Sequence, residues 1–461
     1  MVFDQKEEIM SFINILVAAA NWFWGIPILV LLVGGGLYLS TRLGFFQFRY
    51  FGYILKETFG KMFKKTEGEG SVSNFQAAAT ALASCIGGSN IVGVPVAIAL
   101  GGPGAVFWMW ITALVGMGTK FTEITLGIKY REKNEKGEYV GGAMYYLKNS
   151  PLPFLGTLFA FFLMVEIAPS ISTQTLTFIQ NVELLNINKY LGLGIFIVIV
   201  GLVVFGGLKG IAKFCEIAVP FMATFYIIGG LIVILMNASH IPGAFALIFE
   251  HAFSPMAAAG GFTGAAVAQA IRNGIARGCY SNEAGMGTST IAHATASVEI
   301  PAQQGLWAVF EIFVDTIIVC TVTALVVLVS GVWTELPSDQ AATMPAIAFG
   351  RALGSNVGSV IVSVCLLLFV ITTVIAIIFF GEKQAEFLFG HTAAIVCRVV
   401  YMIFIILGVV FDLSTAYSLL DFMLGLVVIT NMLGIIMMGG EAVEMKNEYF
   451  KNPKYYPKAK K

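Results

Sequence analysis

Two stretches of this sequence place glycines and polar side chains inside otherwise apolar segments. The first is Ala-Ser-Cys-Ile-Gly-Gly-Ser-Asn-Ile-Val-Gly-Val-Pro over residues 83–95, and the second is Gln-Ala-Ile-Arg-Asn-Gly-Ile-Ala-Arg-Gly over residues 269–278. An unwound helix exposes N–H groups and a positive dipole end, which suit a carboxylate, and carbonyls, which suit Na⁺ or an ammonium group. We therefore interpret both runs as helix interruptions that carry ligand groups.

The composition places these runs in a membrane protein. The 461 residues are 57% hydrophobic and only 12% charged, whereas soluble domains carry roughly 25% charged residues. Lys+Arg 27 balance Asp+Glu 27, so nothing indicates nucleic-acid binding. The six cysteines form no spaced framework and are predicted to be buried free thiols. The four histidines lack metal-ligand spacing, and neither a nucleophile elbow nor a phosphate loop is present, which argues against an enzyme.

Charge-free stretches of about 20 residues predict the membrane spans. Eleven are expected, at 12–40, 73–100, 104–128, 152–180, 190–208, 214–237, 258–290, 304–331, 356–381, 393–411 and 415–438. Basic residues concentrate on one side of this arrangement, which predicts a multi-pass protein of the cytoplasmic membrane with its N-terminus outside and its C-terminus inside. The loops are short, so residues 1–461 are expected to form a single transmembrane domain.

The two interruptions fall in the second and seventh spans, which lie five helices apart. Paired interruptions at matching positions are typical of a transporter built from inverted repeats. We expect a peripheral helix at 12–40, a first repeat at about 73–237, a second at about 258–438 and a cytoplasmic tail at 439–461. The alternative is that the glycines only allow close helix packing.

Residues 101–116 read Gly-Gly-Pro-Gly-Ala-Val-Phe-Trp-Met-Trp-Ile-Thr-Ala-Leu-Val-Gly. This run resembles the signature of the sodium:alanine symporter family, and the resemblance extends over essentially the whole chain. It implies the five-plus-five inverted-repeat fold of the bacterial leucine transporter. It also implies alternating-access uptake of alanine and glycine driven by Na⁺, with H⁺ used by some members. The bilayer is the expected environment, and no obligate protein partner is evident.

By the same resemblance, Asn90 and Pro95 match the first core helix of that fold. The widely shared sodium site then takes carbonyls from Ala83, Ile86 and Phe369 together with the hydroxyls of Thr372 and Thr373. Alternatively, the two threonines bond only to carbonyls of their own helix, which is common in membrane helices.

The substrate is expected between the two interruptions. Its carboxylate would meet the N–H groups of residues 87–89 with help from Asn90, and its ammonium would meet freed carbonyls near 273–276. The candidate substrate-binding residues are Thr80, Cys85, Gly87, Gly88, Ser89, Asn90, Gln269, Asn273, Gly274, Ile275 and Ala276. Neither predicted interruption supplies a buried carboxylate, so an uncharged zwitterion is expected, and its small size is implied by the family.

Charged residues inside spans are candidates for function. Lys120 and Glu123 lie three apart and are expected to neutralise each other. Glu311 and Asp315 are read as a structural pair, although Asp315 could instead serve as a proton or cation site. The remaining candidates are Glu166 for proton coupling, and Arg272 and Arg277 either as a gate with Glu283 or as anchors.

Two other functions stay open from the sequence. One is a transporter of the same fold for another solute, or one coupled to H⁺. The other is a channel lined by the broken helices. Flux against a gradient distinguishes a transporter from a channel.

Overall fold

The computed structural model describes residues 14–460 except 63, 65, 66, 136, 254–262 and 410–412. The described chain is mostly helical, and its strands β1 (Glu132–Lys133) and β2 (Tyr139–Val140) pair antiparallel in a short hairpin. The predicted all-α fold is confirmed. Parts of the predicted spans 12–40, 258–290 and 393–411 lie outside the described residues.

A helix lies at each position where a span was predicted. In chain order these are α2 (Ile26–Leu29) with η1 (Val30–Gly34) and α3 (Gly35–Arg42); α6 (Asn74–Cys85) with η3 (Ser89–Gly93) and α7 (Val94–Gly101); α8 (Ala105–Lys129); α10 (Phe154–Leu184); α11 (Lys189–Val204); α12 (Gly207–Met236); α14 (Thr263–Asn282); α16 (Pro301–Ile312) with η6 (Phe313–Cys320) and α17 (Thr321–Val329); α19 (Ser355–Phe389); α20 (His391–Leu407); and α21 (Leu413–Lys451).

Six helical segments among the described residues are long and apolar enough to cross a bilayer, and the bent pair of α6 with Ser89–Gly101 makes seven. The remaining predicted positions are taken by α8, α14 and the shorter apolar helices α11 and α20. Short helices connect them: α4 (Phe46–Arg49), α5 (Phe51–Glu57), η2 (Phe59–Lys61), α9 (Ala143–Lys148), η4 (Ala238–His240), α13 (Ile241–Phe253), α15 (Thr290–His293), η7 (Val332–Thr334), η8 (Ser338–Thr343), α18 (Met344–Leu353) and η9 (Pro457–Lys460).

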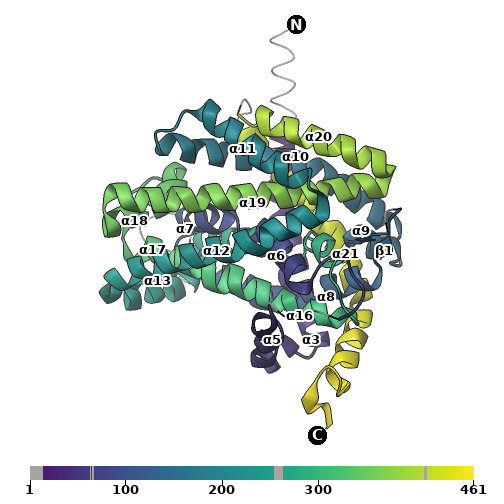
Figure 1. Cartoon of the computed structure of the whole chain (residues 1–461). Coiled ribbons are helices and arrows are strands. Elements are labelled where there is room, and N and C mark those ends of the chain that lie inside the picture. Colours follow the sequence, from purple (N-terminus) through teal and green to yellow (C-terminus); the bar gives the residue numbers. More distant parts are fainter. Residues whose placement is uncertain are drawn as a thin grey trace.

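The helices form two sets of five, each beginning with a broken helix. Helices α12, α16 and α19 cross the molecule in Figure 1, and α10 packs along α19 and α21. Helix α6 packs against α12 and α19, whereas α14 packs against α7 and α8. The two broken helices are therefore enclosed by long continuous ones.

The first interruption lies where the sequence predicts it. Helix α6 begins at a capping box in which Ser73 Oγ accepts from the Gln76 N–H and Gln76 Oε1 accepts from the Ser73 N–H. It ends at Cys85, because Ile86 leaves the helical region with ψ 85°. The chain resumes as a π-helix at Ser89 after a bend of 44°.

The second interruption was placed wrongly at 269–278. Helix α14 runs without a break to Asn282, and the chain leaves it at Glu283, with φ 57°. Gly285 and Gly287 follow with φ 93° and 72°, a region that favours glycine. The glycines of α14 instead allow close packing, since a Cβ on Gly274 would lie 2.3 Å from the Ala105 carbonyl oxygen.

The last helix is longer than predicted. Helix α21 continues to Lys451, so residues 439–451 of the predicted tail are helical. The glycine pair at 439–440 lies within the helix, and Gly439 allows close packing against the first span, since a Cβ there would lie 2.7 Å from Leu39 Cδ2.

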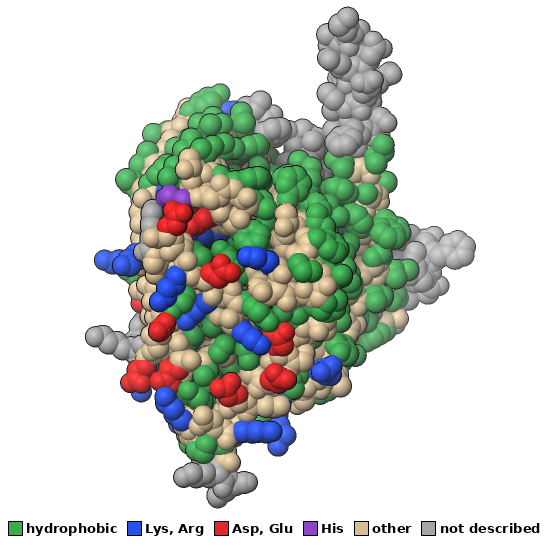
Figure 2. Space-filling view, turned by 90° about the vertical axis from the view of Figure 1, so that its right-hand side faces the viewer, with side chains coloured by type: hydrophobic (Ala, Val, Ile, Leu, Met, Phe, Trp, Pro, Cys, Tyr) green, Lys and Arg blue, Asp and Glu red, His purple; other side chains and the backbone are tan. Residues whose placement is uncertain are grey.

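One end of the molecule is rich in charge. Figure 2 looks onto the end that carries β1 and α9, where Lys, Arg, Asp and Glu side chains gather. Surface ion pairs in this part of the chain include Lys129–Glu441 and Lys454–Glu299. Large exposed hydrophobic side chains, by contrast, are frequent on α10, α11, α12 and α20, as a bilayer contact requires. The chain is a multi-pass membrane protein.

The segments next to the two broken helices are tied together. Isolated β-bridges join Glu69 to Val298 and Val72 to Ala296. The Arg131 guanidinium donates to the carbonyls of Glu69, Ala294 and Ala296 at 2.6, 3.1 and 2.6 Å. These contacts hold the segment before α6 against the segment before α16.

Candidate substrate and cation site

A small cavity lies between the two interruptions and encloses about 40 Å³. Its polar lining comes from the two interruptions with the adjoining ends of α6 and α14, and from α10 and α19: Ser84, Gly87, Ser89, Glu166, Ser170, Gln174, Tyr280, Glu283, Thr288 and Thr373. Its apolar lining is Leu163, Ile167, Met286, Ile377 and Phe380. The cavity combines a few polar groups with an apolar wall, as small-ligand sites do.

Hydroxyl and carbonyl oxygens meet at the first interruption. Thr373 Oγ1 donates to the Ala83 carbonyl at 3.0 Å across the α6–α19 contact. The Gly87 N–H, which an unbroken helix would direct at that carbonyl, donates instead to Asn90 Oδ1 at 2.9 Å. A Cβ on Gly87 would lie 2.5 Å from Thr373 Oγ1, so only glycine allows this approach.

Thr372 bonds to carbonyls of its own helix, which is the alternative considered from the sequence. Its Oγ1 donates to the carbonyls of Phe369 at 2.9 Å and Leu368 at 3.2 Å within α19. Thus one of the two threonines bonds across to the broken helix, while the other bonds within its own helix. Phe369 and Ile86, the remaining residues predicted for the cation, are both fully buried.

Asn90 connects three elements. Its Nδ2 donates to Ser281 Oγ at 3.0 Å and to Asp315 Oδ1 at 2.7 Å, while its Oδ1 holds the Gly87 N–H. The Asp315 carboxylate also accepts from Ser281 and from Thr316. The amide therefore fixes the first interruption to α14 and η6, and it does not line the small cavity.

The other predicted substrate residues lie in different places. Gly88 and Ser89 line a larger cleft of about 740 Å³, which shares Ser89, Gln174 and Tyr280 with the small cavity. Thr80 Oγ1 donates to the Gln76 carbonyl in its own helix, and Cys85 lies 3.3 Å from Lys120 Nζ.

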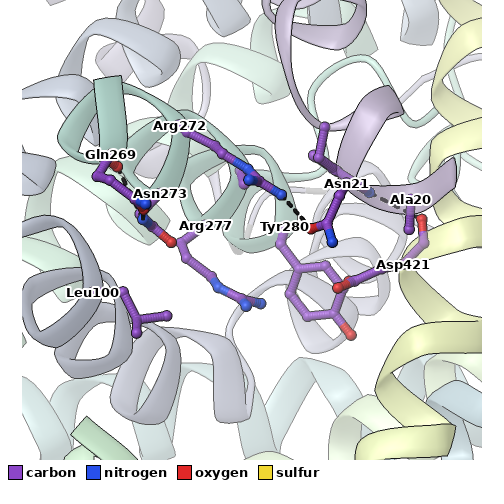
Figure 3. A pocket seen from close by; sticks show the side chains of 11 residues that line it. Ala20, Asn21, Leu100, Gln269, Arg272, Asn273, Arg277, Tyr280 and Asp421 are labelled. Atoms are coloured by element: carbon purple, nitrogen blue, oxygen red, sulfur yellow. Dashed lines mark hydrogen bonds between the residues drawn. The ribbon is translucent and has the colours of Figure 1, made fainter. Parts of the chain in front are cut away.

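Gln269, Asn273 and Ala276 line a separate cavity of about 280 Å³ (Figure 3). In it Asn273 donates to the Gln269 carbonyl at 2.9 Å, and Arg272 donates to Asn21 Oδ1 at 2.5 Å. Gly274 and Ile275 are buried on α14. The structure therefore does not bring these five residues together with 87–90, and neither arginine of α14 pairs with Glu283.

Buried ion pairs differ from those expected. Lys120 Nζ lies 3.1 Å from Glu311 Oε2, and His293 Nε2 lies 2.7 Å from Glu311 Oε1, all three side chains being at most 1% exposed. The expectation that Lys120 neutralises Glu123 was wrong, as was that of a Glu311–Asp315 pair. Glu123 Oε1 instead accepts from the N–H groups of Gly285 and Gly287 at 3.0 and 3.1 Å.

Comparison with known proteins identifies the family. The model of the sodium:alanine symporter family matches residues 9–461. The chain belongs to this family. It is therefore a cation-coupled amino-acid symporter.

Individual relatives of this sodium:alanine symporter family member cover nearly its full length. It is 47% identical to the uncharacterized transporter YflA of Bacillus subtilis, over 95% of this chain and 94% of the relative. It is 38% identical to the sodium/alanine symporter AgcS of Methanococcus maripaludis, over 96% and 99%. It is 34% identical to the probable sodium/glutamine symporter GlnT of B. subtilis, over 96% and 91%.

Solved structures confirm the fold of this family member. The transporter MhsT in complex with L-phenylalanine superposes with a TM-score of 0.55 at 14% identity, covering 82% of this chain and 98% of that one. A Na⁺-coupled sialic acid symporter superposes with a TM-score of 0.50 at 10% identity, covering 93% and 86%. The neighbours share the predicted inverted-repeat fold.

Several residues that line the small cavity of the symporter were not predicted from the sequence. The expectation that no interruption supplies a buried carboxylate was wrong, because Glu283 stands in the true second interruption and is only 6% exposed. Gln174 and Tyr280 were not singled out. The run Asn-Glu-Ala-Gly-Met-Gly at 282–287 carried the usable signal, since two glycines separated by one residue favour a turn over continued helix.

Proposed function

We propose that this protein carries small neutral amino acids, alanine and glycine, into the cell together with Na⁺ by alternating access. The observation that carries the proposal is the 3.0 Å approach of Thr373 Oγ1 to the freed Ala83 carbonyl. That pair brings a hydroxyl of α19 and a carbonyl of the broken helix to one point.

Sodium is the coupling ion in this proposal. Hard cations prefer several oxygen ligands. The hydroxyls of Thr372 and Thr373 and the carbonyls of Ala83, Ile86 and Phe369 would form an uncharged set around the ion. Because the set spans α6 and α19, Na⁺ would stabilise the state in which these helices are close, and a ligand shifts a conformational equilibrium only by such a difference in affinity.

The substrate's carboxylate would face the backbone N–H groups of Gly88 and Ser89 at the start of the resumed helix. Gly87 would contribute after exchange of its bond to Asn90. A water molecule needs roughly 10–15 Å³ on the same measure, so a cavity of about 40 Å³ favours a small side chain. The roles of Thr80, Cys85, Gln269 and residues 273–276 in substrate binding stay predictions. The expectation of freed carbonyls at 273–276 was wrong, because these residues lie within the continuous helix α14.

Uptake into the cell requires the predicted orientation. The charge-rich end in Figure 2 carries many of the lysines and arginines, which favours the cytoplasmic side for it. The N-terminus would then lie outside and the C-terminus inside, and the segments joined by Arg131 would face the cytoplasm.

The test is uptake of labelled alanine into proteoliposomes with an inward Na⁺ gradient, compared with K⁺ in its place. Accumulation only with Na⁺ is expected, and the Thr372→Ala/Thr373→Ala double variant should raise the half-saturating Na⁺ concentration. Accumulation with a proton gradient alone would show that H⁺, and not Na⁺, is the coupling ion. Competition by unlabelled glycine and glutamine measures the substrate range, and stronger competition by glutamine than by glycine would contradict the proposed size preference.

A further inference from the structure

The small cavity carries hydrogen-bond acceptors without a cation to match them. Glu166 and Glu283 both line it. No lysine or arginine is among its described lining residues. A ligand that fills the cavity must therefore supply positive charge or hydrogen-bond donors.

Gln174 provides an independent indication of the same kind. Its side chain is 9% exposed and lines both the small cavity and the larger cleft. Its Oε1 is buried and accepts no hydrogen bond within the described chain. A buried acceptor without a donor costs free energy, so an arriving donor group gains the interaction that the protein lacks.

Glu283 is held in an uncommon backbone conformation. Its φ of 57° is rare for a residue other than glycine, and such strain persists where the surrounding structure supports it, often at functional sites. Its Oε2 accepts from Thr288 Oγ1 at 2.6 Å and from Ser289 Oγ at 2.9 Å. Two hydroxyls on the far side of the interruption thus orient the carboxylate.

We propose that Glu283, together with Glu166 and Gln174, forms the subsite that receives the ammonium group of the transported amino acid. An ammonium has three donors and a full positive charge, which match two carboxylates and one unpaired carbonyl oxygen. The inference rests on the proposed function and adds to it the residues that distinguish an amino acid from the corresponding hydroxy acid.

In this proposal the cation and the substrate's ammonium group share one cavity. Thr373 lines the same cavity as Glu283. A zwitterion adds no net charge to a cavity lined by Glu166 and Glu283, so Na⁺ at Thr373 would supply the positive charge that the substrate does not. The carboxylate therefore favours joint occupancy by the ion and the ammonium group.

The experiment compares ligands that differ only in the group to be recognised. Displacement of labelled alanine from the purified full-length protein in saturating Na⁺ is measured with unlabelled alanine and with lactate, in which a hydroxyl replaces the ammonium. In Glu283→Gln the affinity for alanine should fall by about 10- to 100-fold, the range for a charged hydrogen bond, while that for lactate stays within about twofold. The alanine-to-lactate preference therefore decreases by the same factor.

Further variants keep the test decisive. Glu283→Asp and Glu166→Gln should each lower the preference by a smaller factor, and Gln174→Leu should lower it by about 3- to 10-fold. If Glu283→Gln does not fold, these other variants test the proposal in its place. Glu441→Gln, a surface carboxylate paired with Lys129, is the matched control and should leave the preference unchanged.

An unchanged alanine-to-lactate preference in folded Glu283→Gln would overturn the subsite. So would an increase in the half-saturating Na⁺ concentration with no change in preference, because Glu283 would then act on the ion alone. If the wild-type protein binds another amino acid and not alanine, the proposed substrates fail. The subsite is then tested with that amino acid and its hydroxy analogue.

Discussion

Both helix interruptions leave backbone groups without helical partners, and each satisfies them with different chemistry. At the first, the Gly87 N–H is satisfied within the interruption by Asn90, and a carbonyl is left for a hydroxyl of another helix. At the second, the N–H groups of Gly285 and Gly287 are satisfied by the buried carboxylate of Glu123. The first therefore offers neutral oxygens, which suit a bare ion, and the second is built around negative charge.

Each interruption would have its own part in the proposed site. In the proposed site, the neutral oxygen set would leave the charge of Na⁺ uncompensated, and Glu283 in the same cavity would compensate it. In hydrocarbon every backbone group must find a partner, and each interruption uses a different donor or acceptor class to meet that rule. The proposed site would thus use both interruptions, which line one cavity.

The largest expected effect on stability comes from breaking the buried ion pair between Lys120 and Glu311. Glu311→Gln leaves Lys120 buried without its partner, and breaking such a pair costs about 3–5 kcal/mol. We expect a marked fall in melting temperature in detergent, followed by intrinsic fluorescence. Glu441→Gln, which breaks an exposed pair, should cost less than about 1 kcal/mol. Equal stability of the two variants would contradict the importance of the buried pair.

Replacing one glycine of each interruption by alanine should affect Na⁺ dependence at the first interruption and stability at the second. Gly87→Ala places a Cβ 2.5 Å from Thr373 Oγ1, an overpacking worth about 1–3 kcal/mol, and should raise the half-saturating Na⁺ concentration. Gly285→Ala forces φ 93° on alanine and should lower the melting temperature with little effect on Na⁺ dependence once folded. Identical Na⁺ dependence in both variants would refute the distinction.

The two threonines of α19 should differ in effect. Thr373 bonds across to Ala83, whereas Thr372 bonds within α19. Thr373→Ala should therefore raise the half-saturating Na⁺ concentration by about 10-fold, and Thr372→Ala by less. Thr373→Ser keeps the hydroxyl and serves as the control. Uptake at graded Na⁺ concentrations measures all three, and a larger effect from Thr372→Ala would contradict the assignment.

The smallest effect concerns the surface beside the second broken helix. The hydrogen bond from Lys454 lowers the pKa of Glu299 below its ordinary 4.5. A lowered folded-state pKa adds stability above the unfolded-state pKa, and this stability is lost as the pH falls through the folded-state pKa. The small difference in melting temperature between wild type and Glu299→Gln should therefore disappear below pH 4.5. A difference that grows on acidification would contradict this sign.

The sequence was sufficient for the helices and for one interruption. The paired glycines at 87–88 near Asn90 located the first interruption, because small residues and a capping amide occur together there. The second was misplaced, since Gly274 and Gly278 are compatible with a helix that packs closely, and only backbone angles separate them from Gly285 and Gly287.

The polar interior was harder to predict for a different reason. Helical spacing suggested Lys120 with Glu123, but the partner of Lys120 comes from α16, far along the chain. Pairing between distant helices depends on their packing, which hydrophobic periodicity does not encode. The same limit hid the contribution of Gln174 to the cavity.

The triad of Lys120, Glu311 and His293 also has a consequence for biogenesis. Helix α8 is synthesised and inserted before α16 exists, so its lysine first enters the membrane without a counter-charge. Inserting a lysine at the centre of a helix costs roughly 2.5–3.5 kcal/mol at the translocon, which the apolar remainder of α8 must offset. Until α16 is inserted, the first half of the transporter therefore holds a lysine in the membrane without its partner.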